Sequence, residues 1–179
     1  MPTDPNIHPH WAAETKSFAK DIDQLDYYQI LECAQDSRVG DIKARYHHLQ
    51  RTYHPDTFYQ SPDEELKEAV FRIAKRVAEA YVILRDPVRR DKYTRDINGP
   101  DRLQKLRYTD ESEQEIKKEA VVAVGKTPQG RKLVEKAMAS LEKGDFAGAE
   151  RDLKTALLFE SDNESIKKRL EQVRIQLKK

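Results

Sequence analysis

Three adjacent residues, His54, Pro55 and Asp56, place an imidazole and a carboxylate on either side of a proline. Pro55 fixes its own φ and restricts the backbone of His54, so the two ionisable side chains have less freedom than in an ordinary loop. The pair could act as an acid and a base in catalysis, or it could form a rigid tip that another protein recognises. A purely structural interpretation is a helix C-cap at His54 and a turn former at Asp56.

Catalysis and metal binding find little further support in the sequence. No glycine-rich phosphate loop and no third orienting group accompany the pair. His47 lies on the same helical side as His54, and His8 and His10 could approach, but a full set of metal ligands is not evident. The single cysteine, Cys33, excludes an intramolecular disulfide and a zinc site built from cysteines. We therefore expect no enzymatic activity, no cofactor and no metal.

Two helices are expected to hold the pair between them. Ser37 could cap the first helix, which Pro55 must end. Its inner face is predicted by the helical spacing of Ile42, Tyr46, Leu49 and Tyr53. Residues 61–64 (Ser-Pro-Asp-Glu) have the residue types of a helix start, with Ser61 as the cap and Pro62 as the first helical residue. This second, long helix can pack antiparallel on the first through Val70, Ile73, Val77, Ala80, Tyr81 and Leu84.

Shorter helices are expected on both sides of this hairpin. One runs from Gln24 to about Glu32, with Tyr28 and Leu31 on its inner face. Another is opened by Asp86 and Pro87 and is closed by residues 98–100 (Asn-Gly-Pro).

The first helix of the hairpin also has a basic flank beside its apolar face. The stripe consists of Lys43, His47, Arg51 and His54. A merely solvated face is the alternative interpretation of these residues. With the tip and two further basic positions, the candidate partner-binding residues are His54, Pro55, Asp56, Lys43, Arg45, His47, His48 and Arg51.

Five ordered blocks of sequence resemble the J domain of the DnaJ family over residues 25 to about 96. The blocks are residues 26–31 (DYYQIL), 42–46 (IKARY), 53–56 (YHPD), 79–87 (EAYVILRDP) and 90–93 (RDKY). The resemblance implies a co-chaperone whose basic flank docks on an acidic patch of a DnaK-type ATPase chaperone. It also implies that Asp56 engages an arginine near the partner's interdomain linker and so triggers ATP hydrolysis.

This chain departs from the family pattern at several positions. Glu32 and Cys33 stand where Gly-Val is common, two usually basic positions are His47 and His48, and Thr57 follows the tip in place of a basic residue. The basic patch is therefore weaker than in a typical member. No Gly/Phe-rich stretch and no CxxCxGxG repeats follow the J-domain blocks. The serious functional alternative is a scaffolding protein that keeps the J fold but stimulates no ATPase.

We predict an all-α protein with four segments. They are an N-terminal extension (1–23) that is helical from Ala12, a J domain (24–97), a charged linker (98–129) with one helix, and a C-terminal helical module (130–179). A capping box of Ser112 and Glu115 could open the linker helix. In the extension, Trp11, Phe18, Ile22 and Leu25 recur with helical spacing. Packing of this stripe on the next domain is favoured over a partner-binding anchor.

The C-terminal module is predicted to contain helices over residues 130–143, 146–160 and 163–179. Its small and large positions are similar to one tetratricopeptide repeat at Leu133, Ala137, Gly144, Phe146, Ala149, Leu153 and Ala156, and its third helix has the inner stripe Ile166, Leu170, Val173 and Leu177. Because such repeats generally need at least three copies to shape a groove, a docking or oligomerisation bundle is favoured over a peptide-binding superhelix. Through it the chain would recruit a client or partner.

The charge balance argues against a nucleic-acid or membrane partner. Lys and Arg number 33 and Asp and Glu number 32, so no global field attracts the chain to a polyanion. The basic segment 88–95 contains Asp91, which favours a solvated surface. The N-terminal residues lack the pattern of a signal peptide and no apolar run could span a membrane, so we expect a cytoplasmic protein.

Overall fold

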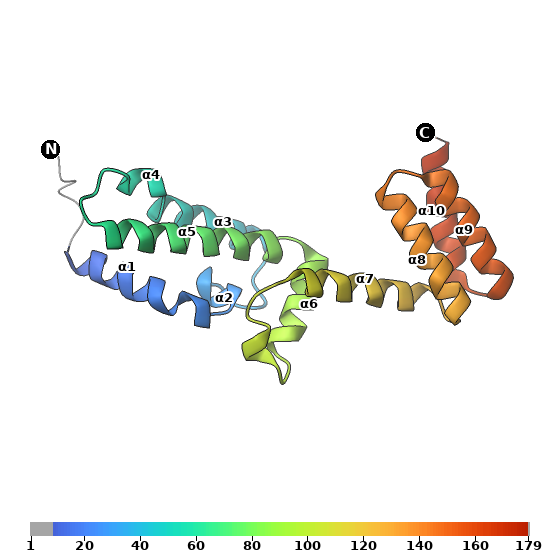
Figure 1. Cartoon of the computed structure of the whole chain (residues 1–179), viewed down its shortest axis with the longest axis horizontal. Coiled ribbons are helices and arrows are strands. Elements are labelled where there is room, and N and C mark those ends of the chain that lie inside the picture. Colours follow the sequence, from blue (N-terminus) through green and yellow to red (C-terminus); the bar gives the residue numbers. More distant parts are fainter. Residues whose placement is uncertain (1–8, 179) are drawn as a thin grey trace. The chain divides into compact units, whose positions relative to one another are not determined.

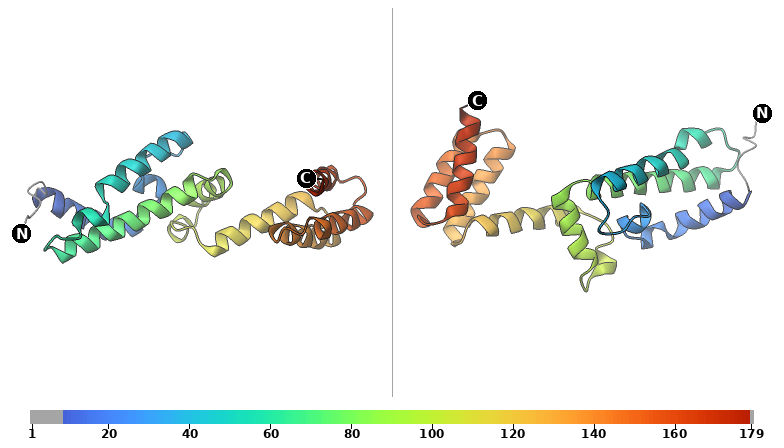
Figure 2. Two further views of the ribbon diagram at one scale, coloured as in Figure 1. Left: turned by 90° about the horizontal axis from the view of Figure 1, so that it is seen from above. Right: turned by 180° about the vertical axis from the view of Figure 1, so that it is seen from behind.

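The computed structural model describes residues 9–178, which form ten α-helices and two short 3-10 helices without any strand (Figure 1). The predicted all-α fold is confirmed. The described chain divides into two compact units, residues 9–112 and 113–178. Each helix of these units can be followed in the two further views of Figure 2. Within the described residues, every helix is too short or too polar to cross a lipid bilayer.

The first unit is built around a helical hairpin. Its elements are α1 (Pro9–Asp21), η1 (Ile22–Gln24), α2 (Tyr27–Ile30), α3 (Val39–Thr52), α4 (Pro55–Phe58), α5 (Glu64–Leu84), α6 (Pro87–Ile97) and η2 (Arg102–Gln104). Helices α3 and α5 pack against each other along the hairpin, while α1 and α2 contact α5 as well (Figure 1). The short helix α4 lies in the connection between α3 and α5, so the tip predicted from the sequence is located between the two long helices.

The core of the first unit follows the predicted apolar stripes. Its fully buried side chains include Tyr27, Ile30, Leu31, Ile42, Ile73, Ala80, Leu84, Tyr93 and Ile97. Tyr46 of α3 stacks on Tyr81 of α5 with ring centroids 4.1 Å apart. Tyr27 stacks on Tyr93 at 4.4 Å, and its backbone N–H donates to the Tyr93 hydroxyl at 2.9 Å. The Tyr46–Tyr81 stack joins the two helices of the hairpin, and the Tyr27–Tyr93 contacts fasten α2 to α6.

Several helix starts differ from the sequence prediction. Helix α3 has Arg38 at its N-cap position without a side-chain cap, so the expected Ser37 cap is wrong; the Ser37 carbonyl instead accepts a hydrogen bond from Arg90 at 2.7 Å. Helix α5 is capped by Asp63, whose carboxylate accepts from the Leu66 N–H at 3.0 Å. The expected cap at Ser61 is therefore wrong, because a charged acceptor is the stronger partner of a helix N-terminus.

The expected helix over residues 24–32 is much shorter than predicted. A capping box between Asp26 and Gln29 starts α2 only at Tyr27. The helix ends at Ile30, and Glu32 adopts a left-handed φ of 51° that cannot continue it.

The N-terminal extension packs on the protein itself, as predicted. Helix α1 already includes Pro9, the first described residue, which lies three residues before the predicted start at Ala12. Ile22 is fully buried, while Phe18 and Leu25 are partly buried against the same core. Residues 1–8, including His8, lie outside the described residues.

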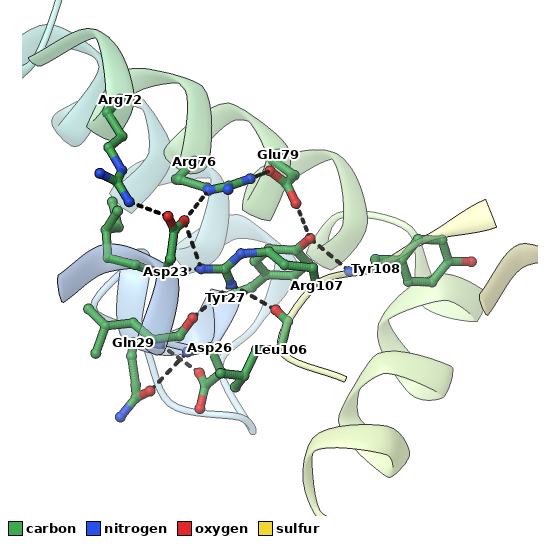
Figure 3. A network of polar contacts seen from close by, with 12 residues as sticks. Asp23, Asp26, Tyr27, Gln29, Arg72, Arg76, Glu79, Leu106, Arg107 and Tyr108 are labelled. Carbon is green, nitrogen blue, oxygen red and sulfur yellow. Dashed lines mark hydrogen bonds and ion pairs between the residues drawn. The ribbon is translucent and has the colours of Figure 1, made fainter. Parts of the chain in front are cut away.

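The chain after α6 folds back onto the first unit. The Arg107 guanidinium donates to the carbonyls of Ile22 at 2.7 Å and Leu25 at 2.8 Å. The Tyr108 N–H donates to the Tyr27 hydroxyl at 3.0 Å, and the same hydroxyl donates to Glu79 (Figure 3). Residues 98–112 of the expected linker are thus fastened to the first unit by long-range polar contacts.

Asp23 lies at the centre of the same polar network. Its carboxylate pairs with Arg72, with Arg76 at 2.8 Å and with Arg107 at 3.6 Å (Figure 3). Burial raises the pKa of Asp23, but the hydrogen bonds and charges of Arg72 and Arg76 outweigh this effect and lower it. The network ties α5 and the returning segment to the residues that follow α1.

Replacing Arg107 by alanine is expected to lower the free energy of unfolding of the first unit by about 2 kcal/mol, because two partly buried carbonyls lose a charged donor. Urea unfolding followed by the fluorescence of Trp11, the only tryptophan, reports this unit. Arg38→Ala is the matched control, since the Arg38 side chain is 92% exposed. Equal unfolding midpoints for both variants would contradict a stabilising role of the Arg107 hydrogen bonds.

The second unit contains α7 (Asp110–Val124), α8 (Pro128–Glu142), α9 (Phe146–Phe159) and α10 (Glu164–Leu177), with residues 110–112 of α7 belonging to the first unit. Its buried core consists of Val134, Ala137, Ala149, Leu153, Ala156, Ile166, Leu170 and Val173. Leu177 is 44% exposed, so its expected place in the inner stripe is wrong; it is the last residue of α10. Gly144 takes a φ of 76° at the turn between α8 and α9, as only glycine does without strain.

The start of α7 also differs from the prediction. The helix begins at Asp110, and Ser112 lies inside its first turn, where its hydroxyl accepts from the Thr109 N–H at 3.3 Å. The expected capping box of Ser112 and Glu115 is therefore wrong, because the helix has already begun two residues earlier.

A buried carboxylate closes the second unit. Glu160, 8% exposed, accepts hydrogen bonds from the Lys126 N–H at 2.9 Å, the Thr127 hydroxyl at 2.7 Å and the Asn163 side chain. Burial alone would raise the pKa of Glu160, but these donors outweigh it and lower the pKa to about 2. One side chain thus joins the start of α8 to the end of α9 and the start of α10.

Candidate functional site

The His-Pro-Asp turn (residues 54–56) joins α3 to α4. Helix α3 ends at Thr52, and His54 has an extended backbone with φ −77° and ψ 122°. Its Nδ1 atom accepts from the Asp56 N–H at 3.3 Å, so His54 caps the start of α4. His54 is therefore neither the C-cap of α3 nor part of its helical stripe, because Pro55 forces the preceding residue out of the helical region.

The carboxylate of Asp56 points into solvent. Its side chain is 91% exposed, whereas that of His54 is 45% exposed. The distance of 3.8 Å between the Asp56 carboxylate and His54 Nδ1 is longer than a hydrogen bond. Asp56 consequently presents an acidic group that an arginine or lysine of another protein could contact.

The basic flank is present on α3, although not all its predicted members share it. The side chains of Lys43, His47, His48 and Arg51 are all exposed. Lys43, His47 and Arg51 are four residues apart and so occupy one side of the helix. This side and the His-Pro-Asp turn belong to one continuous stretch of chain.

Arg45 belongs to the internal structure instead. Its Nε donates to the Leu31 carbonyl at 3.3 Å, and its guanidinium pairs with Glu32. Glu32 is one of the residues that depart from the family pattern, and its left-handed backbone holds the carboxylate beside α3. The pair fastens the loop after α2, so Arg45 contributes less to the exposed flank than the sequence prediction assumed.

The sequence prediction missed the residue that anchors the turn. Phe58, the last residue of α4, is 6% exposed and packs in a cluster with Leu66 and Val70 of α5. Its neighbour Tyr59 is 79% exposed. Two adjacent aromatic residues just after the turn were the available signal, but their order did not reveal which one is buried.

The histidines within residues 9–178 are not part of a cluster that could bind a metal ion. Within residues 9–178, no three His, Cys, Asp or Glu side chains lie close enough together to hold a metal ion. His8, which could have approached His47 and His54, lies outside the described residues.

Comparison with known proteins identifies the first unit. The DnaJ domain family model matches residues 26–94. The chaperone protein DnaJ of Nitratidesulfovibrio vulgaris (strain DP4) is 42% identical over 74 residues, which are 41% of this chain and 18% of that protein. Adaptation to cold protein J of Shewanella oneidensis is 35% identical over 75 residues, which are 42% of this chain and 79% of that protein.

These matches confirm the predicted J-domain resemblance. The match spans less than a fifth of the DnaJ relative. No solved structure matches the chain. The tetratricopeptide resemblance of residues 130–179 stays a prediction.

Proposed function

Since the chain belongs to the DnaJ-domain family, we propose that it docks on a DnaK-type chaperone and accelerates its ATP hydrolysis. The observation that carries this proposal is the exposed Asp56 carboxylate on the His-Pro-Asp turn, next to the exposed cations of α3. A partner with an acidic surface beside an arginine would complement both features.

In this proposal the chain is an allosteric activator and not an enzyme. It supplies no group to the phosphate, and its binding energy changes the conformational equilibrium of the partner. Each exposed ion pair contributes about 0–1 kcal/mol, so docking is weak, rapid and sensitive to salt. Asp56 then provides the specificity that the diffuse charges of the flank cannot.

The second unit would recruit a client or partner to the chaperone. This unit has a hydrophobic core of its own, formed by residues of α8, α9 and α10. We also propose a cytoplasmic location, which suits a chain with a single, half-buried cysteine.

The test is single-turnover ATP hydrolysis by a DnaK-type chaperone with and without the full chain. The wild-type chain is expected to raise the rate, and His54→Gln to lower the stimulation about tenfold, because the flexible glutamine no longer caps α4 in the same way. A wild-type chain that binds the chaperone or a client without changing the rate would instead support the scaffolding alternative.

A further inference from the structure

Helix α1 lies outside the residues that match the DnaJ domain, yet it packs against α5, the helix that follows the His-Pro-Asp turn. Its first turn carries Trp11, the only tryptophan of the chain. The Trp11 ring stacks on Phe58, with centroids 5.4 Å apart and planes at 11°. It also stacks on Tyr53, at 6.0 Å and 19°. One side chain of α1 therefore contacts the residue before the His-Pro-Asp turn and the residue that anchors α4.

Two further contacts connect α1 to the chain around the turn. Phe18 lies against Tyr53 with ring centroids 6.4 Å apart. The Lys16 ammonium contacts Asp63 at 2.9 Å and Glu65 at 3.0 Å, at the start of α5. Helix α1 thus reaches the chain before, within and after the connection that carries the turn.

The turn needs such support because α4 is too short to be stable alone. It has four residues, and a single helical turn is unstable in water without tertiary packing. The Thr57 N–H donates to the His54 carbonyl at 3.1 Å and the Tyr59 N–H to the Asp56 carbonyl at 3.4 Å. Ordering each residue costs about 1–2 kcal/mol, which the burial of Phe58 must offset.

We propose that α1 is a brace that holds the His-Pro-Asp turn in its docking conformation, with Trp11 as the main positioning residue. The docking part rests on the proposed function. Trp11 covers the buried Phe58 ring, whereas His54 and Asp56 remain exposed. The brace therefore orders the turn without occupying the groups that a partner would contact. If the turn is ordered only part of the time, its apparent affinity for a partner falls in proportion to the fraction of molecules in which it is ordered.

The first test measures amide hydrogen exchange at Thr57, Tyr59 and Ser61 in the full chain, without any chaperone. Trp11→Ala is expected to accelerate exchange at these amides about tenfold, because local opening becomes easier. Trp11→Phe keeps a stacking ring and should restore most of the protection. Ser17→Ala, at an exposed position of α1, is the matched control and should change nothing. Unchanged exchange in Trp11→Ala would overturn the brace.

The second test measures stimulation of the DnaK-type chaperone by the same variants. Trp11→Ala is expected to raise the half-maximal concentration about fivefold while the maximal stimulation is retained, because only the population of the ordered turn falls. Faster exchange with a wild-type half-maximal concentration would overturn the docking role of the brace. Absence of stimulation by the wild-type chain would instead count against the proposed function, and the exchange result would still decide whether α1 orders the turn.

A milder variant keeps the inference testable if Trp11→Ala fails to fold. Lys16→Gln removes the contacts with Asp63 and Glu65 and leaves the aromatic stack intact. It is expected to accelerate exchange at Thr57 and Ser61 about twofold. If Trp11→Ala does not fold, wild-type exchange in Lys16→Gln would overturn the brace.

Discussion

Replacing Asp56 by asparagine is expected to reduce stimulation of a DnaK-type chaperone at least about tenfold while leaving the fold intact. The amide keeps the size of the side chain but removes the charge, and a charge-assisted hydrogen bond is about twice as strong as a neutral one. The fold should not respond, because the side chain is 91% exposed. The measurement is the single-turnover rate of ATP hydrolysis at saturating chain.

The matched control for this prediction is Asp36→Asn. Asp36 is an exposed aspartate in the loop between α2 and α3 and should leave the stimulation unchanged. Thermal unfolding of both variants should match the wild-type chain. An Asp56→Asn chain that stimulates as well as the wild type would rule out Asp56 as the group read by the partner.

Replacing Glu160 by glutamine is expected to lower the free energy of unfolding of the second unit by about 3 kcal/mol at neutral pH. The carboxylate accepts hydrogen bonds from Lys126, Thr127 and Asn163 at once. A glutamine amide has only one acceptor oxygen, so its NH2 group would face one of these donors without forming a hydrogen bond. The pKa of Glu160 is lowered from its ordinary 4.5 to about 2. Its contribution is therefore present above about pH 4.5 and is lost as the pH falls towards about 2.

The second unit must be measured by itself to test this prediction. All tryptophan and tyrosine residues lie before residue 109, so fluorescence reports only the first unit. Amide hydrogen exchange at core residues of α8 and α9, such as Ala137 and Leu153, reports the second. Glu164→Gln, at a side chain that is 83% exposed, is the matched control. Equal loss of protection on acidification in wild type and Glu160→Gln would contradict the assigned role.

Local patterns were sufficient to predict most helices, since apolar spacing and proline positions depend on nearby residues alone. The hairpin of α3 and α5 and the turn between α8 and α9 were found in this way. Helix caps were predicted less well. Ser61 and Asp63 both have the right chemistry for a cap, and only the structure shows that the carboxylate takes the Leu66 N–H.

Contacts between distant residues explain what the sequence could not reveal. The segment after α6 has no apolar period, and Arg107 holds it through carbonyl groups, which every residue has. At the candidate site, the exposed Asp56 and the α3 cations could be predicted from the motif and its helix. Arg45 pairs with Glu32 and does not join the exposed flank. This pairing depends on the left-handed backbone of Glu32, which no spacing rule indicates.

The contrast between Asp56 and Phe58 has a consequence for how this surface can change over generations. Because its side chain is 91% exposed, we expect the aspartate to add little to folding, so a population selected only for stable chains would lose it. Phe58, 6% exposed, would be retained under the same selection. Selection for stability alone would therefore not keep the acidic side chain, while the aromatic anchor of the same short helix would persist even in a descendant that bound no other protein.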